Sequence, residues 1–237
     1  MESYDYIVIG AGSAGCVVAH RLTEDKDVRV LLIEAGGSDK SFLFRRPGAL
    51  AIVYQYPRFK KKADWGYRTT PQPRMDDRDM MCTRGKILGG CSTVNGMIYI
   101  RGNPLDYQGW AQQPGLENWS YAHVLPYFKR LENRLIGGDE YRGEGGPLHL
   151  TTPDCDNPLF SAFFEAAQEA GYPLTEDVNG YQQESFGKFD RTTFRGRRFN
   201  AARAYLHPVM ERENLTVRTQ VLVHRIVFEG TRAIGVE

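Results

Sequence analysis

The amino-terminal segment carries two apolar runs separated by a glycine-rich stretch and an amphipathic run. Residues Tyr6–Ile9 are β-branched and aromatic, Cys16–Leu22 places apolar residues at helical spacing, and Val28–Ile33 is apolar nearly throughout. A strand, a helix and a second strand in this order predict one βαβ unit over residues 1–36. The continuous apolar character of the second strand is typical of a parallel strand buried on both faces.

The rest of the chain alternates helical patterns with irregular stretches. From Gly36 to about Met81 periodicity fades, and the basic run Lys60–Lys62 there is expected to be a solvated loop. Helices are predicted at Trp119–Leu131, with Ser120 as the N-cap, at Leu159–Ala170 and, shortened by Pro208, at Ala201–Arg212. Strands are predicted at Met97–Ile100, Leu215–Thr219, Val221–Phe228 and Ala233–Val236.

Composition narrows the class of protein. Of 237 residues, 41% are hydrophobic and 25% are charged, with a net charge of +1, so nucleic acid is not an expected partner. The acidic start Met1–Asp5 lacks the basic region of a secretory signal, and no apolar stretch approaches the roughly 18 residues of a membrane span. We expect a cytoplasmic protein, and peripheral association with the inner membrane stays open.

The cysteines do not suggest a metal or redox site. Cys16, Cys82, Cys91 and Cys155 include no C-x-x-C pair, so zinc and thioredoxin-like sites have no support. Reduced thiols are expected, although spacing alone does not exclude a disulfide. No metal ligand is predicted.

The stretch Gly10–Gly15 is the first candidate site. Gly10, Gly12 and Gly15 fit the pattern G-x-G-x-x-G between a strand and a helix, a context that favours a dinucleotide site over a plain glycine turn. The first glycine permits a tight turn, the second lets the backbone approach a pyrophosphate, and the third lets helix and strand pack closely. The helix start then offers free N–H groups to phosphate.

Glu34 supplies the acidic partner of this motif. It ends the second predicted strand, where a dinucleotide fold places a carboxylate that accepts hydrogen bonds from a ribose. A carboxylate there disfavours NADP, whose ribose carries a phosphate. FAD and NAD share the ADP half, so these residues do not choose between them, and a surface glutamate after a glycine turn is the simpler alternative.

A second glycine-rich stretch spans Arg84–Gly96. Its four glycines and interleaved small residues make a backbone that can lie against a flat ligand. It is not a P-loop, because no glycine-lysine pair is followed by Ser or Thr. A hairpin turning at Asn95-Gly96 is an equally good interpretation from these residues alone.

These segments resemble the glucose–methanol–choline (GMC) oxidoreductases. The resemblance covers Arg84–Gly96, the opening Asp5–Gly15 and the step Glu34–Gly36. Further stretches are similar to the choline dehydrogenases of that family: Tyr99–Asn103, Trp110–Gln112, Pro114–Tyr121, Asn157–Phe160 and Asp177–Glu184.

The resemblance implies an α/β fold: a Rossmann-like FAD-binding domain with a parallel sheet, β-rich tail strands and part of a substrate domain. Residues 1–237 would form the amino-terminal FAD-binding portion. Within it, 82–102 would be the flavin-side loop, 155–195 the start of the substrate domain and 200–237 the return to the FAD domain.

The resemblance also assigns cofactor contacts and implies FAD rather than NAD. In the set of contacts that the resemblance implies, the first glycine motif surrounds the pyrophosphate and Glu34 binds the ribose. Val221, on a tail strand, would place backbone groups against the adenine, and the second stretch would contact the flavin side. The residues are Gly10, Gly12, Ser13, Ala14, Gly15, Glu34, Ala35, Arg84, Ile87, Gly90, Ser92, Asn95, Gly96, Met97, Ile98 and Val221.

Two positions depart from the family pattern. Val94 occupies the place of a histidine that bonds covalently to the flavin in some members, so FAD is expected to be non-covalent. Cys91 stands where most members have Ser or Gly, and a thiol is a weaker hydrogen-bond donor.

The implied reaction is oxidation of an alcohol such as choline to its aldehyde by hydride transfer to flavin, with a histidine as general base. That histidine is expected beyond residue 237, so no catalytic residue is assigned and the C-terminal catalytic part is expected to be absent. The histidines present are interpreted as surface or structural: His20, His123, His149, His207 and His224. The chain alone is expected to be inactive and to bind FAD poorly.

The electron acceptor stays open between oxygen and a respiratory quinone. A medium-chain aliphatic alcohol is the alternative substrate. An NAD-dependent dehydrogenase and a non-catalytic dinucleotide-binding fragment are the alternative classes of function.

Overall fold

The computed structural model describes residues 2–49, 52 and 55–237. The chain divides into two compact units. Unit 1 comprises Met1–Gly96 and Gly196–Glu237, and unit 2 comprises Met97–Arg195. Each unit is described separately below.

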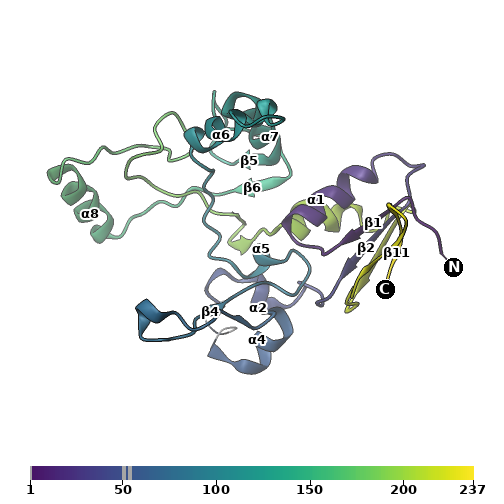
Figure 1. Ribbon diagram of the computed structural model, residues 1–237. Coiled ribbons are helices and arrows are strands. Elements are labelled where there is room, and N and C mark those ends of the chain that lie inside the picture. Colours follow the sequence, from purple (N-terminus) through teal and green to yellow (C-terminus); the bar gives the residue numbers. More distant parts are fainter. Residues whose placement is uncertain (1, 50–51, 53–54) are drawn as a thin grey trace. The chain divides into compact units, whose positions relative to one another are not determined.

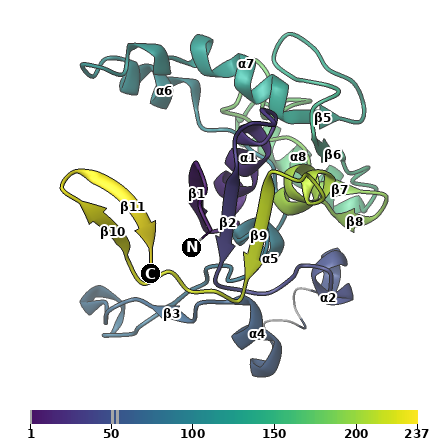
Figure 2. The ribbon, with the colours of Figure 1, turned by 90° about the vertical axis from the view of Figure 1, so that its right-hand side faces the viewer.

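The centre of unit 1 is a three-stranded parallel sheet in the order β1-β2-β9 (Figure 2). Its strands are β1 (Tyr6–Ile9), β2 (Val30–Glu34) and β9 (Leu215–Thr219). Every residue of β2 is buried, because this strand has a neighbour on each side and apolar side chains on both faces. The prediction of a buried parallel strand after the first helix is confirmed, and so is the α/β fold.

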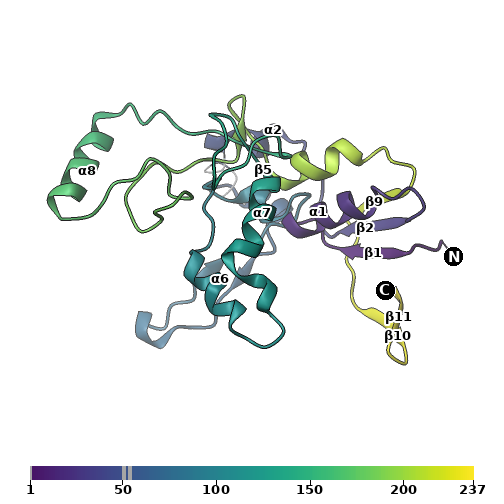
Figure 3. The same ribbon diagram turned by 90° about the horizontal axis from the view of Figure 1, so that it is seen from above.

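Helix α1 (Ser13–Leu22) follows β1 and returns the chain toward β2. The segment η4 (Ala202–Leu206), continued by η5 (His207–Val209), lies along α1 (Figure 3). Buried alanines in both elements, such as Ala19 and Ala202, allow this close packing. The predicted helix Ala201–Arg212 is present in shortened form, as a π-helical turn followed by the 3-10 turn that contains Pro208.

The irregular segment of unit 1 consists of short elements. These are α2 (Phe42–Arg45), η1 (Pro47–Ala49), α4 (Pro57–Ala63), β3 (Tyr67–Arg68), η2 (Pro73–Met75), β4 (Met81–Cys82) and α5 (Cys91–Val94). Two interpretations need correction. Lys60–Lys62 lie in α4 rather than in a loop. The hairpin at Asn95-Gly96 is wrong, because the preceding residues form the one-turn helix α5.

The tail of unit 1 differs in part from the predicted strands. Strands β10 (Ile226–Glu229) and β11 (Arg232–Val236) form an antiparallel hairpin. The predicted strand Val221–Phe228 is wrong in its first half, because residues 221–225 lie outside any strand. Val221 instead belongs to the connection after β9, where its backbone N–H donates to the Glu34 carbonyl at 3.1 Å.

Unit 2 contains short helices and strands with long connections (Figure 1). They are α6 (Pro104–Ala111), η3 (Glu117–Trp119), α7 (Tyr121–Leu131), β5 (Glu132–Arg134), β6 (Leu148–Leu150), α8 (Pro158–Glu169) and β7 (Thr193–Phe194); β8 (Arg197–Arg198) follows in unit 1. The predicted helix with Ser120 as N-cap and the predicted helix Leu159–Ala170 are confirmed. The strand predicted at Met97–Ile100 is wrong: Met97 has φ +66° and Ile98 makes only an isolated bridge.

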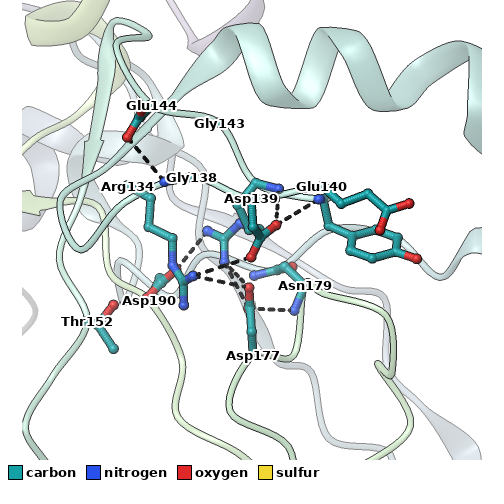
Figure 4. A network of polar contacts seen from close by, with 12 residues as sticks. Arg134, Gly138, Asp139, Glu140, Gly143, Glu144, Thr152, Asp177, Asn179 and Asp190 are labelled. Atoms are coloured by element: carbon teal, nitrogen blue, oxygen red, sulfur yellow. Dashed lines mark hydrogen bonds and ion pairs between the residues drawn. The ribbon is translucent and has the colours of Figure 1, made fainter.

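Unit 2 contains a cluster of buried, paired ions. Arg142 is 1% exposed and donates to Glu132, Asp177 and Asp190 at 2.9, 2.7 and 2.7 Å. Figure 4 shows Asp177 and Asp190, two of the carboxylates of this network. Burial alone would lower the pKa of Arg142, but the hydrogen bonds and charges of Glu132 and Asp177 outweigh it and raise that pKa. Arg142 therefore stays charged and joins three separate chain segments.

Among the described residues, no helix has both the length and the apolar character needed to cross a membrane.

Candidate functional site

The glycine-rich turn between β1 and α1 has the geometry that its glycines predict. Gly10 has φ +92° and donates its N–H to the Ile33 carbonyl at 2.7 Å, a conformation that favours glycine. A Cβ on Gly15 would lie 1.9 Å from the Gly10 carbonyl oxygen. The first glycine therefore makes the turn, and the third lets α1 approach the strand.

The start of α1 is open at Gly12. Gly12 is the N-cap, and no side chain caps the first turn, so the first backbone N–H groups lack an intrahelical acceptor. A Cβ on Gly12 would meet no heavy atom within 4 Å. The protein itself leaves space at this glycine, which suits the close approach of a ligand to the backbone.

The Glu34 carboxylate is fixed at the end of β2. Its Oε2 accepts a hydrogen bond from the Ala11 N–H at 2.9 Å, and its Oε1 accepts one from the Gly36 N–H at 2.8 Å. Glu34 is 5% exposed. An ionised carboxylate can accept about four hydrogen bonds, so two backbone bonds orient it and leave capacity for hydroxyl donors.

The two glycine-rich stretches meet. Gly89 donates its N–H to the Ala11 carbonyl at 2.7 Å, and a Cβ on Gly90 would lie 2.8 Å from the Gly12 Cα. Gly90 also has φ +53°. The second stretch therefore packs backbone to backbone against the first, which only glycine allows here.

A cavity of about 290 Å³, which we call the glycine cavity, lies where these segments meet. Six predicted site residues line it: Gly10, Gly12, Glu34, Ala35, Gly90 and Val221. The other lining residues are Ile9, Ile33, Trp65, Gly85, Leu222 and Val223. The start of α1, the fixed carboxylate and part of the second glycine stretch therefore line the same cavity.

Trp65 is a lining residue whose role sequence reasoning missed. It lies in the irregular segment, where its backbone N–H donates to the Arg84 carbonyl at 3.0 Å and its ring stacks on that of Tyr67 with the centroids 5.9 Å apart. The Lys86 ammonium lies 4.8 Å from its ring centroid. The only hint in the sequence is that a segment so long and irregular usually covers something.

A second cavity of about 520 Å³, the loop cavity, lies beside the second glycine stretch. It is lined by Met81, Thr83, Arg84, Cys91, Val94 and Asn95. Arg84 and Asn95 are predicted site residues. Val94, at the family's flavin-linking position, also belongs to an apolar cluster with Phe44, Ala63 and Ile87.

The remaining predicted residues are placed less directly. Ser13 and Ala14 are exposed at the start of α1. Gly96 is also exposed, and a Cβ on it would meet no heavy atom within 4 Å. Ile87 is 2% exposed and lines a third cavity with Ala35. The Ser92 hydroxyl accepts the Ala201 N–H at 3.0 Å. Met97 and Ile98 belong to unit 2.

Cys16 and Asp39 are buried groups that support the site. Burial raises the pKa of the Cys16 thiol to about 12, so the thiol stays protonated and donates to the Ala11 carbonyl at 3.3 Å. Burial would raise the pKa of Asp39, but hydrogen bonds from His207 and Asn200 and the nearby charges outweigh it and lower that pKa. Among the described residues, no cluster of His, Cys, Asp and Glu could hold a metal ion.

Comparison with known proteins identifies the family. The family model described as GMC oxidoreductase matches residues 4–237. The chain belongs to the GMC oxidoreductase family. The resemblance seen in the glycine-rich stretches is therefore confirmed over nearly the whole chain.

Individual relatives of this GMC oxidoreductase chain agree. It is 56% identical over 237 residues to an oxygen-dependent choline dehydrogenase from Chromohalobacter salexigens, covering 98% of this chain and 42% of the relative. It is 54% identical over 239 residues to a protein of the same description from Staphylococcus xylosus, covering 99% and 42%. The chain thus spans about two fifths of the length of these relatives.

Solved structures share the fold. The crystal structure of pyridoxine 4-oxidase from Mesorbium loti superposes with a TM-score of 0.91 at 36% identity, covering 99% of this chain and 45% of that one. An FAD-dependent oxidoreductase from Chaetomium thermophilum gives a TM-score of 0.87 at 31% identity, covering 99% and 41%. The Rossmann-like interpretation of unit 1 is in accord with both.

Proposed function

We propose that unit 1 binds FAD, with the ADP half in the glycine cavity. The observation that carries this proposal is the pairing of an open glycine at the start of α1 with a carboxylate fixed at the end of β2. Gly12 leaves room beside free N–H groups, which suit a pyrophosphate. Glu34 is held by the Ala11 and Gly36 N–H groups, which suits a ribose.

The cavity walls fit the rest of the ADP half. Ile9, Ile33 and Val221 supply apolar surface, and Trp65 supplies an aromatic ring. A planar adenine gains from such contacts, and backbone groups after β9 lie within the same wall. Val221 therefore keeps its proposed place beside the adenine, although from a connection rather than from a strand.

The flavin side of the proposed site is the second glycine stretch. Arg84 and Asn95 line the loop cavity, while Ile87 lies in the apolar cluster with Val94. Ser92 and Gly96 complete the proposed set within unit 1. Val94 has only a hydrocarbon side chain, so we propose that FAD is held without a covalent bond.

The proposed reaction is oxidation of a primary alcohol, with choline to betaine aldehyde as the first choice. Bound FAD supplies a two-electron acceptor for hydride. The relatives described as oxygen-dependent choline dehydrogenases support this substrate and favour oxygen over a quinone as the proposed electron acceptor. The role of this chain in the reaction is to bind and orient the cofactor, since we place no proton-transferring side chain in it.

The test uses the protein purified from its full-length gene. Denaturation should release free FAD rather than a flavin peptide, and the holoprotein should oxidise choline faster than medium-chain aliphatic alcohols. A protein that binds NAD but no flavin would contradict the cofactor proposal. Faster oxidation of an aliphatic alcohol would contradict only the substrate.

A further inference from the structure

The helical turn in the second glycine stretch is too short to be stable by itself. This turn, α5, contains only the four residues Cys91–Val94, and an isolated single turn is unstable because nucleation costs more than one hydrogen bond returns. The carbonyls at its end also lack intrahelical donors. Asn95, which lines the loop cavity, directly follows this turn as its C-cap. Contacts that hold the turn therefore also hold Asn95.

Arg198 reaches this turn from a distant part of the sequence. Its guanidinium donates to the Ser92 carbonyl at 3.1 Å, to the Asn95 Oδ1 at 2.9 Å and to the Asn95 carbonyl at 2.7 Å. Arg198 is 2% exposed. A buried cation at the carboxyl end of a helical turn is favourable, and the rigid fork of arginine engages several acceptors at once.

Two further contacts from the same segment complete the support. Asn200 donates to the Thr93 hydroxyl at 2.7 Å and to Asp39 at 3.0 Å, and the Ala201 N–H donates to the Ser92 hydroxyl at 3.0 Å. The segment 198–201 thus contacts α5 along its length. Within this segment, Arg198 is the residue that bonds both Ser92 of α5 and Asn95, which directly follows the helix.

We propose that Arg198 is a positioning residue that presets Asn95 and the end of α5 for the flavin half of the cofactor. This inference rests on the proposed FAD site. Arg198 lies outside the walls of the glycine cavity. The loss of Arg198 should therefore weaken binding of the flavin half and leave binding of the ADP half intact.

The experiment measures the dissociation constants of FAD and of ADP for the full-length apoprotein by calorimetry. Arg198→Gln should weaken FAD binding by about tenfold, because FAD must then order the turn that Arg198 no longer holds, at a cost of roughly 1.4 kcal/mol. It should leave ADP affinity unchanged. Arg198→Lys keeps a buried cation without the fork, so it should recover part of the loss. The matched control is Arg197→Gln, an exposed neighbour.

The outcomes separate the two proposals. Unchanged FAD affinity in Arg198→Gln would overturn the positioning role, and so would an equal loss for FAD and ADP. A changed absorbance band of bound flavin in the variant would support it. If Arg198→Gln does not fold, the FAD and ADP affinities of Arg198→Lys are compared instead. A loss for FAD alone would support the positioning role, and unchanged FAD affinity or an equal loss for both ligands would overturn it. An unaltered protein that binds neither FAD nor ADP would instead contradict the proposed function.

Discussion

The two units of this chain are stabilised in different ways. Of the buried apolar side chains in the described residues, all but Met97, Leu150, Ala167 and Val178 lie in unit 1. Unit 1 buries β2 and packs α1 against η4 through alanines, whereas unit 2 buries Arg142 among three carboxylates. Unit 1 thus depends on apolar burial and close backbone packing, and unit 2 depends on compensated charge.

This difference bears on where the proposed cofactor site lies. An apolar sheet with glycine contacts holds backbone groups in fixed positions, as an ADP site requires. A charged core is sensitive to the loss of any one partner, because the remaining charges stay buried. Substitutions in the two units should therefore lower the stability of the protein for different reasons: lost charge compensation in unit 2 and disturbed backbone packing in unit 1.

The largest effect is expected from Arg142→Met in unit 2. Removing this cation leaves Glu132, Asp177 and Asp190 with only Arg101 and Arg134 as cationic partners. The negative charge that is no longer compensated should cost about 3–5 kcal/mol of unfolding free energy. Chemical denaturation measures the loss. The exposed Arg130→Met on α7 is the matched control, with an effect within about 0.5 kcal/mol. Equal stability of the two variants would show that the ion cluster does not stabilise unit 2.

A smaller effect is expected from Gly15→Ala in unit 1. The new Cβ would lie 1.9 Å from the Gly10 carbonyl oxygen, so α1 must shift, at a cost of about 1–3 kcal/mol. Gly12→Ala is the control within the same turn, because its Cβ meets nothing within 4 Å. Thermal unfolding should separate the two variants. Equal melting temperatures would mean that the close approach of α1 to the turn is not needed.

Asp39→Asn should have a pH-dependent effect of about 1 kcal/mol at neutral pH. The folded-state pKa of Asp39 is lowered, so the carboxylate stabilises the fold fully above its unfolded value of about 3.9 and loses this as pH falls through the lower folded value. Unfolding free energies of both proteins, measured from neutral to acid pH, should therefore converge in acid. A constant difference at all pH values would contradict this role.

The smallest effect concerns thiol labelling, with no change in stability. Cys16 is buried with a pKa of about 12, so it should resist alkylation in the folded protein. Cys91 is exposed in the loop cavity and should react, more slowly once FAD is bound. Mass spectrometry of the labelled peptides reads both rates. Rapid labelling of Cys16 would contradict the packing of α1.

Local pattern was enough to predict part of this structure. Gly10, Gly12, Gly15 and Glu34 are close in sequence, and their spacing follows from one strand-turn-helix-strand unit. Trp65 joins the same cavity from a segment without periodicity, so no pattern marked it. Val221 reaches it from a connection whose β-rich composition wrongly predicts a strand.

Contacts between distant residues could not be read from the sequence. Arg198 and Asn95 are 103 positions apart, and nothing local to either residue indicates the pairing. The ion cluster of unit 2 was missed for another reason: charged residues are usually exposed, and only their mutual compensation allows Arg142 and Glu132 to be buried.

We propose that the space at Gly12 accommodates the pyrophosphate of the bound cofactor. Calorimetric titration of the full-length apoprotein with ADP and FAD tests it in Gly12→Ala, with Gly109→Ala on α6 as the control, since neither Cβ meets an atom within 4 Å. We predict at least about tenfold weaker binding of both ligands to Gly12→Ala alone, with only the small loss of stability expected when alanine replaces glycine at a helix N-cap. Equal affinities for Gly12→Ala and the control would contradict the claim.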